Sequence, residues 1–362
     1  MRIFSPVLIE ISPCVLVSGN DVSFYQRKNT RPPRHKSALD KPAHKMKAVI
    51  LSFTIASLFF LGTSEAKENG PPPARKHTAI QSHLITPVPA NVKPAFQSIV
   101  RVTVENGQRK IKSNGIPTHL VGRFPNCGNP HSISRQRHSF STPLNPRLKE
   151  QITELESGWV FGVAINGVPF EPLAAEWYLG ARNSIWRYEA LGGAVNLGVD
   201  ENYAHVQPGG KYHYHGLPIG LLKKLGASEG ADSVLVGWAA DGFPIYGPYI
   251  FRNGVDSSSG LKEMRSSYRL KTGARASDSN APGGLFDGAF VNDFYYVDGL
   301  HELDQCNGAF LKTPEFPKGT YAYFLSKDWP IIPRCFRGRP DSSFNKRGRG
   351  RHAKPGKRPA DC

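Results

Sequence analysis

The chain has 362 residues and a formal net charge of +17, which is long enough for one large domain or two ordinary ones. The positive charge lies at the ends: residues 1–45 carry 8 Lys and Arg against 3 Asp and Glu, residues 336–362 carry 9 against 2, and residues 151–335 carry 15 against 20. A general nucleic-acid-binding surface needs basic residues clustered on the folded part, so nucleic acid is not an expected partner.

A secretory signal peptide is predicted at residues 46–66. There a Lys is followed by an apolar run of 14 residues and then by small residues at the two positions that signal peptidase reads. The run is shorter than the roughly 20 residues that cross a bilayer. We therefore expect a secreted or periplasmic protein without a stable membrane span after cleavage. Residues 1–45 have no fold pattern and are interpreted as a doubtful N-terminal extension, with synthesis beginning at Met46.

The rest of the chain divides by composition into four expected segments: a Pro-rich linker (67–98), a poorly defined segment (99–150), a folded domain (151–339) and a basic tail (340–362). The second segment contains one predicted hairpin at Asn106-Gly107, because Asn-Gly supplies the positive φ angles of a type I′ turn. The tail is rich in Gly, Pro and like charges, so we expect it to be disordered. It could contact anionic polysaccharide or the cell envelope, although a solubilising role is the simpler expectation.

Two more hairpins are predicted in the domain, at Asn166-Gly167 and Asp241-Gly242. Five positions of the first match positions 75 residues later, four with the same residue and one as Asn against Asp: Gly162, Ala164, Asn166, Gly167 and Pro169 match Gly237, Ala239, Asp241, Gly242 and Pro244. This repeat indicates an internal duplication or two equivalent strand pairs in one sheet, with coincidence in a Gly-rich sequence as the alternative.

Further strands are predicted within residues 184–191, 293–299 and 319–326, and short helices within 220–228 and 174–181. Short apolar runs separated by Gly, Pro and Asn are typical of all-β folds. We expect a mainly β fold, a β-sandwich or partly open barrel built from short hairpins with few short helices.

The run Gln207–Gly216 reads QPGGKYHYHG. His213 and His215 project from one face of a strand, and the loop decides whether His205 joins them. A two-residue loop turns His205 away, whereas a three-residue loop places it opposite His213. Pro at the second position and Gly at the fourth favour a type I turn followed by a left-handed residue, which is the three-residue loop.

Opposed strand residues have Cβ atoms about 4.5–5.5 Å apart, so the three imidazoles could reach one ion at about 2.0–2.1 Å. The sequence thus predicts a zinc or copper site at His205, His213 and His215, with structural hydrogen bonding as the alternative. Five acidic or imidazole side chains could orient a metal-bound histidine: Asp200, Glu201, His301, Glu302 and Asp304. Asp241 is assigned to its turn, with a ligand or acid/base role as the alternative. The sequence does not choose between a hydrolase and a copper oxidoreductase.

Export would permit disulfides. Four cysteines follow the predicted signal peptide, namely Cys127, Cys306, Cys335 and Cys362, and they allow three pairings. Cys306–Cys335 is favoured because both residues flank what reads as one C-terminal unit.

Four blocks of the domain, HVQPGGKYHYHGLP, GWAADGFPIYGPY, LDQCNGAF and TPEFPKGTYAYFLS, resemble the YHYH-domain family of secreted proteins. The resemblance covers roughly residues 159–339. It implies an exported protein of a kind suspected of binding metal, and it implies no substrate because the family has no established activity.

Two functions follow as expectations. The first is a secreted or periplasmic β-rich protein that binds zinc or copper through the histidine hairpin, with or without catalysis. The second is a non-catalytic extracellular module whose Tyr- and Trp-rich strands bind polysaccharide or a protein partner. The side-chain register around Pro208 discriminates between them, because three histidines on one face favour the metal.

Overall fold

The computed structural model describes residues 76–227 and 233–346. The expected N-terminal extension (1–45), the expected signal peptide (46–66) and residues 347–362 of the expected tail lie outside the described residues. Within the described part, no helix has both the length and the apolar character needed to cross a membrane.

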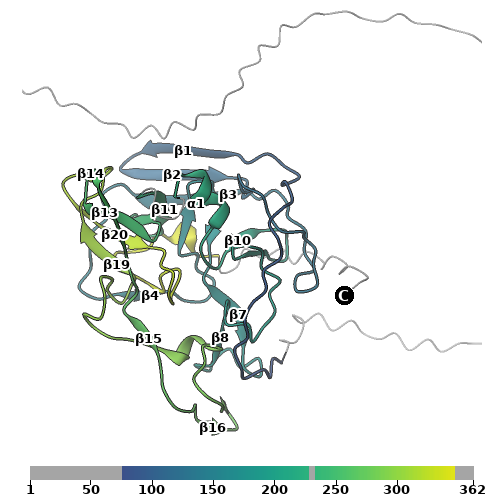
Figure 1. Ribbon diagram of the computed structural model, residues 1–362. Coiled ribbons are helices and arrows are strands. Elements are labelled where there is room, and N and C mark those ends of the chain that lie inside the picture. The colour runs from purple at the N-terminus through teal and green to yellow at the C-terminus, as the bar shows by residue number, and fades with distance from the viewer. Residues whose placement is uncertain (1–75, 228–232, 347–362) are drawn as a thin grey trace, which may run out of the picture. The chain divides into compact units, whose positions relative to one another are not determined.

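The fold is mainly β, as predicted, and is organised by one sheet that curls into a half-barrel (Figure 1). The strands of this sheet, in spatial order, are β19 (Gly308–Leu311), β20 (Thr320–Phe324), β12 (Pro244–Tyr246), β11 (Leu235–Ala239), β5 (Gly162–Ala164), β6 (Pro169–Phe170), β10 (Tyr212–Tyr214) and β9 (Ala204–Val206). Neighbouring strands are antiparallel except for two parallel pairs, β6 with β10 and β12 with β20.

Smaller sheets surround the half-barrel. A three-stranded sheet contains β1 (Val100–Glu105), β2 (Gln108–Ser113) and β3 (His138–Pro143). The two-stranded sheets are β4 (Thr153–Glu154) with β21 (Cys335–Phe336), β7 (Leu173–Trp177) with β8 (Arg187–Glu189), β13 (Tyr249–Asn253) with β14 (Asp256–Glu263), β15 (Tyr268–Leu270) with β18 (Phe294–Tyr296), and β16 (Ser277–Asp278) with β17 (Ala281–Pro282).

Helical structure is sparse. In the described ranges the single α-helix is α1 (Ile219–Lys224), and the 3-10 helices are η1 (Val291–Asp293) and η2 (Ser342–Phe344). The helix predicted within 220–228 is confirmed, whereas the one predicted within 174–181 is wrong, because that segment forms β7. The buried residues Ala174 and Trp177 are three positions apart, which imitates a helix. The spacing arises instead from an irregular register between β7 and β8.

The predicted Asn-Gly hairpin joins β1 and β2. Glu105 pairs with Gln108 across a two-residue turn, and Asn106 and Gly107 have φ angles of 51° and 71°. Positive φ at both central residues is the requirement of the predicted type I′ turn.

The two hairpins that share the 75-residue offset lie side by side at the centre of the large sheet. Strand β5 pairs with β11 so that Gly162 opposes Ala239 and Ala164 opposes Gly237. The repeat relates Gly162 to Gly237 and Ala164 to Ala239, so it carries one pair onto the other, which is the pattern of a local two-fold relation. The backbone bonds of the turns repeat as well: Ala164 N–Val168 O and Gly167 N–Ala164 O recur as Ala239 N–Phe243 O and Gly242 N–Ala239 O. The prediction of two equivalent strand pairs is confirmed.

The two-fold relation continues outward to both edges of the sheet. On one side β6 pairs in parallel with β10, which forms a hairpin with β9; on the other β12 pairs in parallel with β20, which forms a hairpin with β19. We call β5, β6, β9 and β10 the histidine half and β11, β12, β19 and β20 the apolar half. The run Tyr212–His215 then corresponds to Tyr321–Phe324, which reads YAYF.

Side-chain contacts recur in the two halves. The matched bonds are Asn166 Nδ2–Tyr214 Oη (2.9 Å) with Tyr323 Oη–Asp241 Oδ2 (2.6 Å), and Tyr212 Oη–Asp200 Oδ2 (2.7 Å) with Tyr321 Oη–Asp304 Oδ2 (3.0 Å). Asp241 is thus more than a turn residue, since its buried carboxylate also accepts from a tyrosine. These tyrosines project into the main hydrophobic core, so the alternate residues of β10 and β20 lie on the opposite face.

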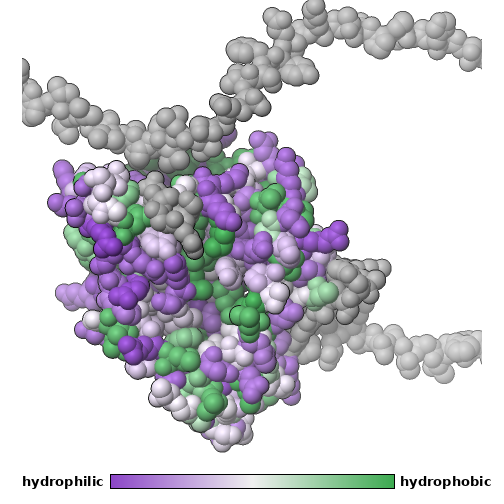
Figure 2. All heavy atoms as spheres, in the orientation of Figure 1, coloured by the Kyte–Doolittle hydropathy of each residue, from purple (hydrophilic) through white to green (hydrophobic). Residues whose placement is uncertain are grey.

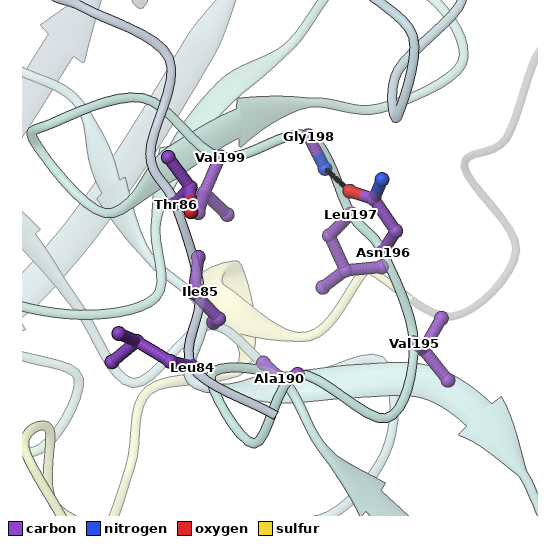
Figure 3. A pocket seen from close by; sticks show the side chains of 10 residues that line it. Leu84, Ile85, Thr86, Ala190, Val195, Asn196, Leu197, Gly198 and Val199 are labelled. Atoms are coloured by element: carbon purple, nitrogen blue, oxygen red, sulfur yellow. Dashed lines mark hydrogen bonds between the residues drawn. The ribbon is translucent and has the colours of Figure 1, made fainter. Parts of the chain in front are cut away.

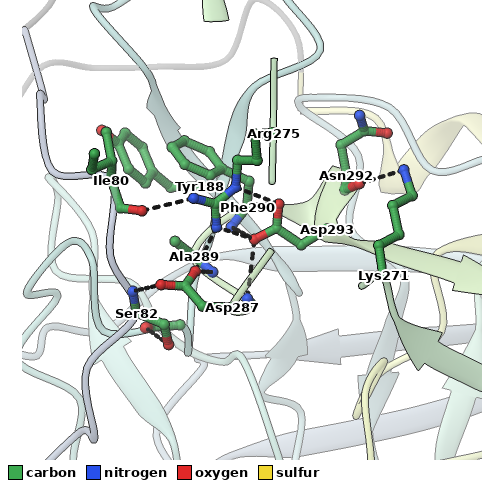
Figure 4. Close-up of polar contacts among 12 residues, drawn as sticks. Ile80, Ser82, Tyr188, Lys271, Arg275, Asp287, Ala289, Phe290, Asn292 and Asp293 are labelled. Carbon is green, nitrogen blue, oxygen red and sulfur yellow. Dashed lines mark hydrogen bonds and ion pairs between the residues drawn. The ribbon is translucent and has the colours of Figure 1, made fainter. Parts of the chain in front are cut away.

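Residues 76–92, within the expected linker, form an extended strap along the domain. His83 N donates to Gly192 O (3.0 Å) and Val88 N to Val199 O (2.9 Å). A buried guanidinium also holds the strap: Arg275 donates to the Ile80 carbonyl and pairs with Asp287 and Asp293 (Figure 4).

The predicted disulfide Cys306–Cys335 is confirmed, with Cα atoms 5.1 Å apart. It ties the segment before β19 to β21. Cys362 lies outside the described residues.

Candidate metal centre

The histidine hairpin has the predicted register. His205 is the cross-strand partner of His213, and Tyr212 is the partner of Val206. Gln207 N donates to Lys211 O (2.9 Å), which closes a three-residue loop. The pleat therefore directs His205 to the same face as His213 and His215.

The turn type differs from the prediction. Gly209 and Gly210 have φ angles of 92° and 81°, and positive φ at the third turn position belongs to a type II turn rather than to type I. Glycine is required at the fourth position for a second reason: a Cβ on Gly210 would collide with the Ser134 side chain and the Ser132 carbonyl. The neighbouring segment approaches that closely because Ser134 N donates to Gly210 O (2.9 Å).

The three imidazoles form a nearly equilateral cluster. Their ring centroids are 4.6 Å apart for His205 and His213, 4.8 Å for His205 and His215, and 4.7 Å for His213 and His215. One nitrogen from each ring lies within 4.8 Å of the other two. His213 and His215 are 1% and 3% exposed, while His205 is half-buried.

Backbone carbonyls orient two of the rings. His205 Nδ1 lies 3.0 Å from Leu197 O, and His213 Nδ1 lies 3.3 Å from Lys211 O. A carbonyl only accepts, so these contacts place the proton on Nδ1 and leave the Nε2 lone pair available. Asn129 Nδ2 also lies 3.2 Å from His205 Nδ1, but two carbonyls are available to accept its two hydrogens. Asn129 secures the first contact, because its Nδ2 donates to the carbonyls of both Leu197 and Val206.

The third ring completes the donor set. Nε2 of His215 lies 3.0 Å from Nε2 of His213, close to the roughly 3.3 Å between two ligands of one tetrahedral ion with metal–nitrogen bonds of about 2.0–2.1 Å. His215 Nδ1 is buried and makes no well-formed hydrogen bond among the described residues, although a backbone interaction with Pro172 raises the pKa of the ring. Without an ion, one Nε2 must donate to the other. With an ion, the His215 proton would lie on Nδ1, where the Pro172 backbone can accept it, and both Nε2 lone pairs would point at the metal.

Burial keeps the cluster neutral. It lowers the pKa of His205 to about 4 and holds the pKa values of His213 and His215 well below the ordinary value. Neutral imidazole is the form that binds a metal ion, so at pH 7 the three rings are in the ligating state.

The expected orienting residues lie elsewhere, and that interpretation is wrong. Asp200 accepts from Tyr212 on the opposite face of β10. Glu201 accepts from Ala90 N on the strap, and Glu302 pairs with Lys262 (3.4 Å). Asp304 belongs to the apolar half, and His301 follows the β15–β18 sheet, where its backbone N–H donates to Ser267.

Three polar residues that the sequence did not reveal border the cluster instead. Gln207 Nε2 donates to Glu171 Oε2 (2.8 Å) and lies 3.5 Å from His213 Nε2. Lys211 pairs with the other oxygen of Glu171. Glu171 directly follows β6, so it reaches the histidines only through the parallel pairing of β6 with β10. No short-range sequence signal marks that pairing.

A small pocket lies behind the carbonyl that orients His205. The strap residues Leu84–Thr86 form one wall and the loop residues Val195–Val199 form the other (Figure 3). Its volume is about 290 Å³. Leu197 belongs both to this wall and to the contact with His205, so the strap and the loop together support the cluster.

A comparison with known families matches residues 139–338 to the model of the YHYH proteins. No curated protein and no solved structure matches the chain. The matched residues are more than half of the chain and include both halves of the large sheet. The chain therefore belongs to the YHYH protein family.

Proposed function

We propose that this protein binds one zinc or copper ion through His205, His213 and His215. The observation that carries the proposal is the convergence of three neutral imidazoles, two of them buried and one half-buried, with the Nε2 atoms of His213 and His215 3.0 Å apart. Buried polar groups are normally well hydrogen-bonded, whereas His215 Nδ1 makes no well-formed hydrogen bond among the described residues.

Three histidines leave a coordination position for water or a substrate group. Zinc in such a site lowers the pKa of bound water, and copper can transfer electrons. Zinc would suit a hydrolase, and copper would suit an oxidoreductase. What is proposed is metal binding, without a choice between these activities.

We also propose that the protein is exported. The signal-peptide pattern at residues 46–66 supports this, and so does the disulfide Cys306–Cys335, because such bonds persist in oxidising compartments.

The alternative of a non-catalytic interaction module has less support. Of the aromatic residues it would use, Trp177, Trp186 and Tyr188 are 8%, 7% and 0% exposed, and Tyr295 is 44% exposed. On the face drawn in Figure 2, polar and apolar residues are interspersed. Contact of the basic tail with anionic polysaccharide or the cell envelope stays an expectation.

Metal content tests the proposal. The full chain would be expressed with export, purified without a histidine tag and analysed by plasma mass spectrometry, beside the double variant His213→Ala/His215→Ala. A matched control, His83→Ala/His301→Ala, removes two imidazoles outside the cluster. We expect about one ion per chain in the wild type and the control, and none in the cluster variant. A wild type that binds neither zinc nor copper after titration would refute the proposal.

A further inference from the structure

The charged groups beside the cluster cancel one another. Glu171 and Lys211 form an ion pair whose side chains are 14% and 12% exposed. Burial raises the pKa of Glu171, but Lys211, with smaller contributions from Lys346 and Gln207, outweighs burial and the net pKa is lowered, so the carboxylate is ionised. Gln207 joins the pair to the cluster, since its amide nitrogen contacts both Glu171 and His213.

The same two residues are the strongest fixed charges that act on the imidazoles. Glu171 raises the pKa values of His205 and His215, and Lys211 lowers those of His205 and His213. His131 also acts on His205, but burial lowers its pKa, so it is neutral at pH 7. An incoming metal ion therefore meets three neutral ligands and no net negative charge.

An ion buried in such a place keeps its whole charge uncompensated. The cost of burying an ion rises steeply with its charge, and it is greater for Zn²⁺ than for Cu⁺. Cuprous ion also forms stable three-coordinate complexes with neutral nitrogen ligands, whereas Zn²⁺ requires a fourth ligand.

We propose that the site selects cuprous copper over zinc, and that the Glu171–Lys211 ion pair sets this preference by neutralising the one carboxylate that, among the described residues, borders the imidazoles. This inference rests on the proposed metal binding by His205, His213 and His215. Lys211 is thus a specificity-determining residue that does not itself contact the ion.

A charge cycle at the pair tests the inference. The affinities of the full chain for Cu⁺ and Zn²⁺ would be measured at pH 7.5 by competition with chromophoric chelators, with ascorbate and without oxygen for Cu⁺. The variants are Lys211→Met, Glu171→Gln and their combination, with Lys211→Arg as the charge-conserving control. The readout is the ratio of the two affinities, because a general loss of structure weakens both metals together.

We expect the wild type and Lys211→Arg to bind Cu⁺ more tightly than Zn²⁺. Lys211→Met leaves a net negative charge and should shift the ratio toward Zn²⁺ by about tenfold or more, and Glu171→Gln should shift it the opposite way. The double variant, which is again neutral, should return to the wild-type ratio.

Two results would overturn the inference while leaving metal binding intact: a wild type that prefers Zn²⁺, or a ratio that does not respond to Lys211→Met. A double variant that loses Zn²⁺ altogether would identify Glu171 as a ligand and would overturn it too. A wild type that binds neither ion would refute the proposed function itself.

Discussion

The two halves of the large sheet share one framework and differ on one face. Their strands pair in the same way, and Tyr212 and Tyr214 correspond to Tyr321 and Tyr323. On the other face, three histidines in one half stand where the other half has Ala309, Ala322 and Phe324. In the apolar half this face packs with Tyr246, Ile250, Met264 and Leu303.

The difference teaches that the framework does not depend on what this face carries. Backbone groups pair the strands, and the tyrosines pack in the main hydrophobic core. The side chains that alternate with the tyrosines, on the opposite face, can therefore differ between the two halves without changing the strand pairing. The counterpart of Glu171 is Tyr246, which stacks on Phe324 at 6.0 Å between ring centroids. The histidine half thus has a polar site where the apolar half has an apolar cluster, and the residues of the two correspond one to one.

Conversion of the histidine half into the apolar type should give the largest effect. The variant His205→Ala/His213→Ala/His215→Phe removes three imidazoles whose folded pKa values are depressed. Unfolded histidine binds protons below about pH 6.5 whereas the buried rings do not, so their contribution to stability is lost as the pH falls toward 4. At pH 5 this costs about 2 kcal/mol for an imidazole with a folded pKa of about 4.

Urea unfolding with a chelator present, at pH 7.5 and at pH 5, checks this prediction. Between these pH values the stability of the variant should rise relative to the wild type by about 4 kcal/mol or more. Parallel changes in the two proteins would mean that the three folded rings take up protons as readily as unfolded histidines do.

Removal of the disulfide should weaken the apolar half alone. Cys306 stands where the histidine half has Asn202, so only one half carries this cross-link. Closing a loop between cysteines that are 29 positions apart is worth about 3–4 kcal/mol. Hydrogen exchange of Cys306→Ala/Cys335→Ala should show lost protection in β19 and β20 and retained protection in β9 and β10. Equal losses of protection in the two halves would mean that the disulfide stabilises the whole sheet and not the apolar half alone.

The two matched aspartates, Asp200 and Asp304, should contribute differently to the free energy of unfolding because they differ in burial. Asp200 is 0% exposed and accepts from Tyr212 Oη and Gly122 N, whereas the side chain of Asp304 is 32% exposed. Asp200→Ala should cost about 3 kcal/mol, since buried donors lose their acceptor, and Asp304→Ala about 1 kcal/mol, since water can replace it. Chemical denaturation of both variants measures the two losses of stability, and equal losses would contradict the prediction.

A smaller effect concerns Asp241, whose counterpart is the uncharged Asn166. Burial raises the pKa of Asp241 to about 6, against hydrogen bonds from Tyr323 and Gly338 that lower it. A raised carboxyl pKa favours the fold at low pH, and this contribution is lost as the pH rises through 6. Between pH 4.5 and 6.5 the wild type should therefore lose about 2 kcal/mol relative to Asp241→Asn. Unfolding curves that keep a constant offset over this range would exclude the titration of Asp241.

The sequence by itself determined the features that depend on a few neighbouring residues. Asn106-Gly107 predicted its turn, because few residues adopt positive φ at two successive positions. Pro208–Gly210 predicted the loop length, and with it the register that places His205 opposite His213, because side chains alternate along a strand. The 75-residue repeat predicted the equivalence of the two central hairpins, although the full two-fold relation of the sheet had no visible counterpart in the sequence.

Only the tertiary structure decided which groups surround the histidines. Glu171 reaches them through the parallel pairing of β6 with β10, and Leu197 orients His205 from a loop that the strap supports. The sequence instead pointed to acidic residues near the hairpin, such as Asp200, which face the core side of the sheet. Contacts of this kind join segments that are far apart in the chain. Their partners are chosen by packing and by strand order, whereas turn chemistry and side-chain alternation act only over a few residues.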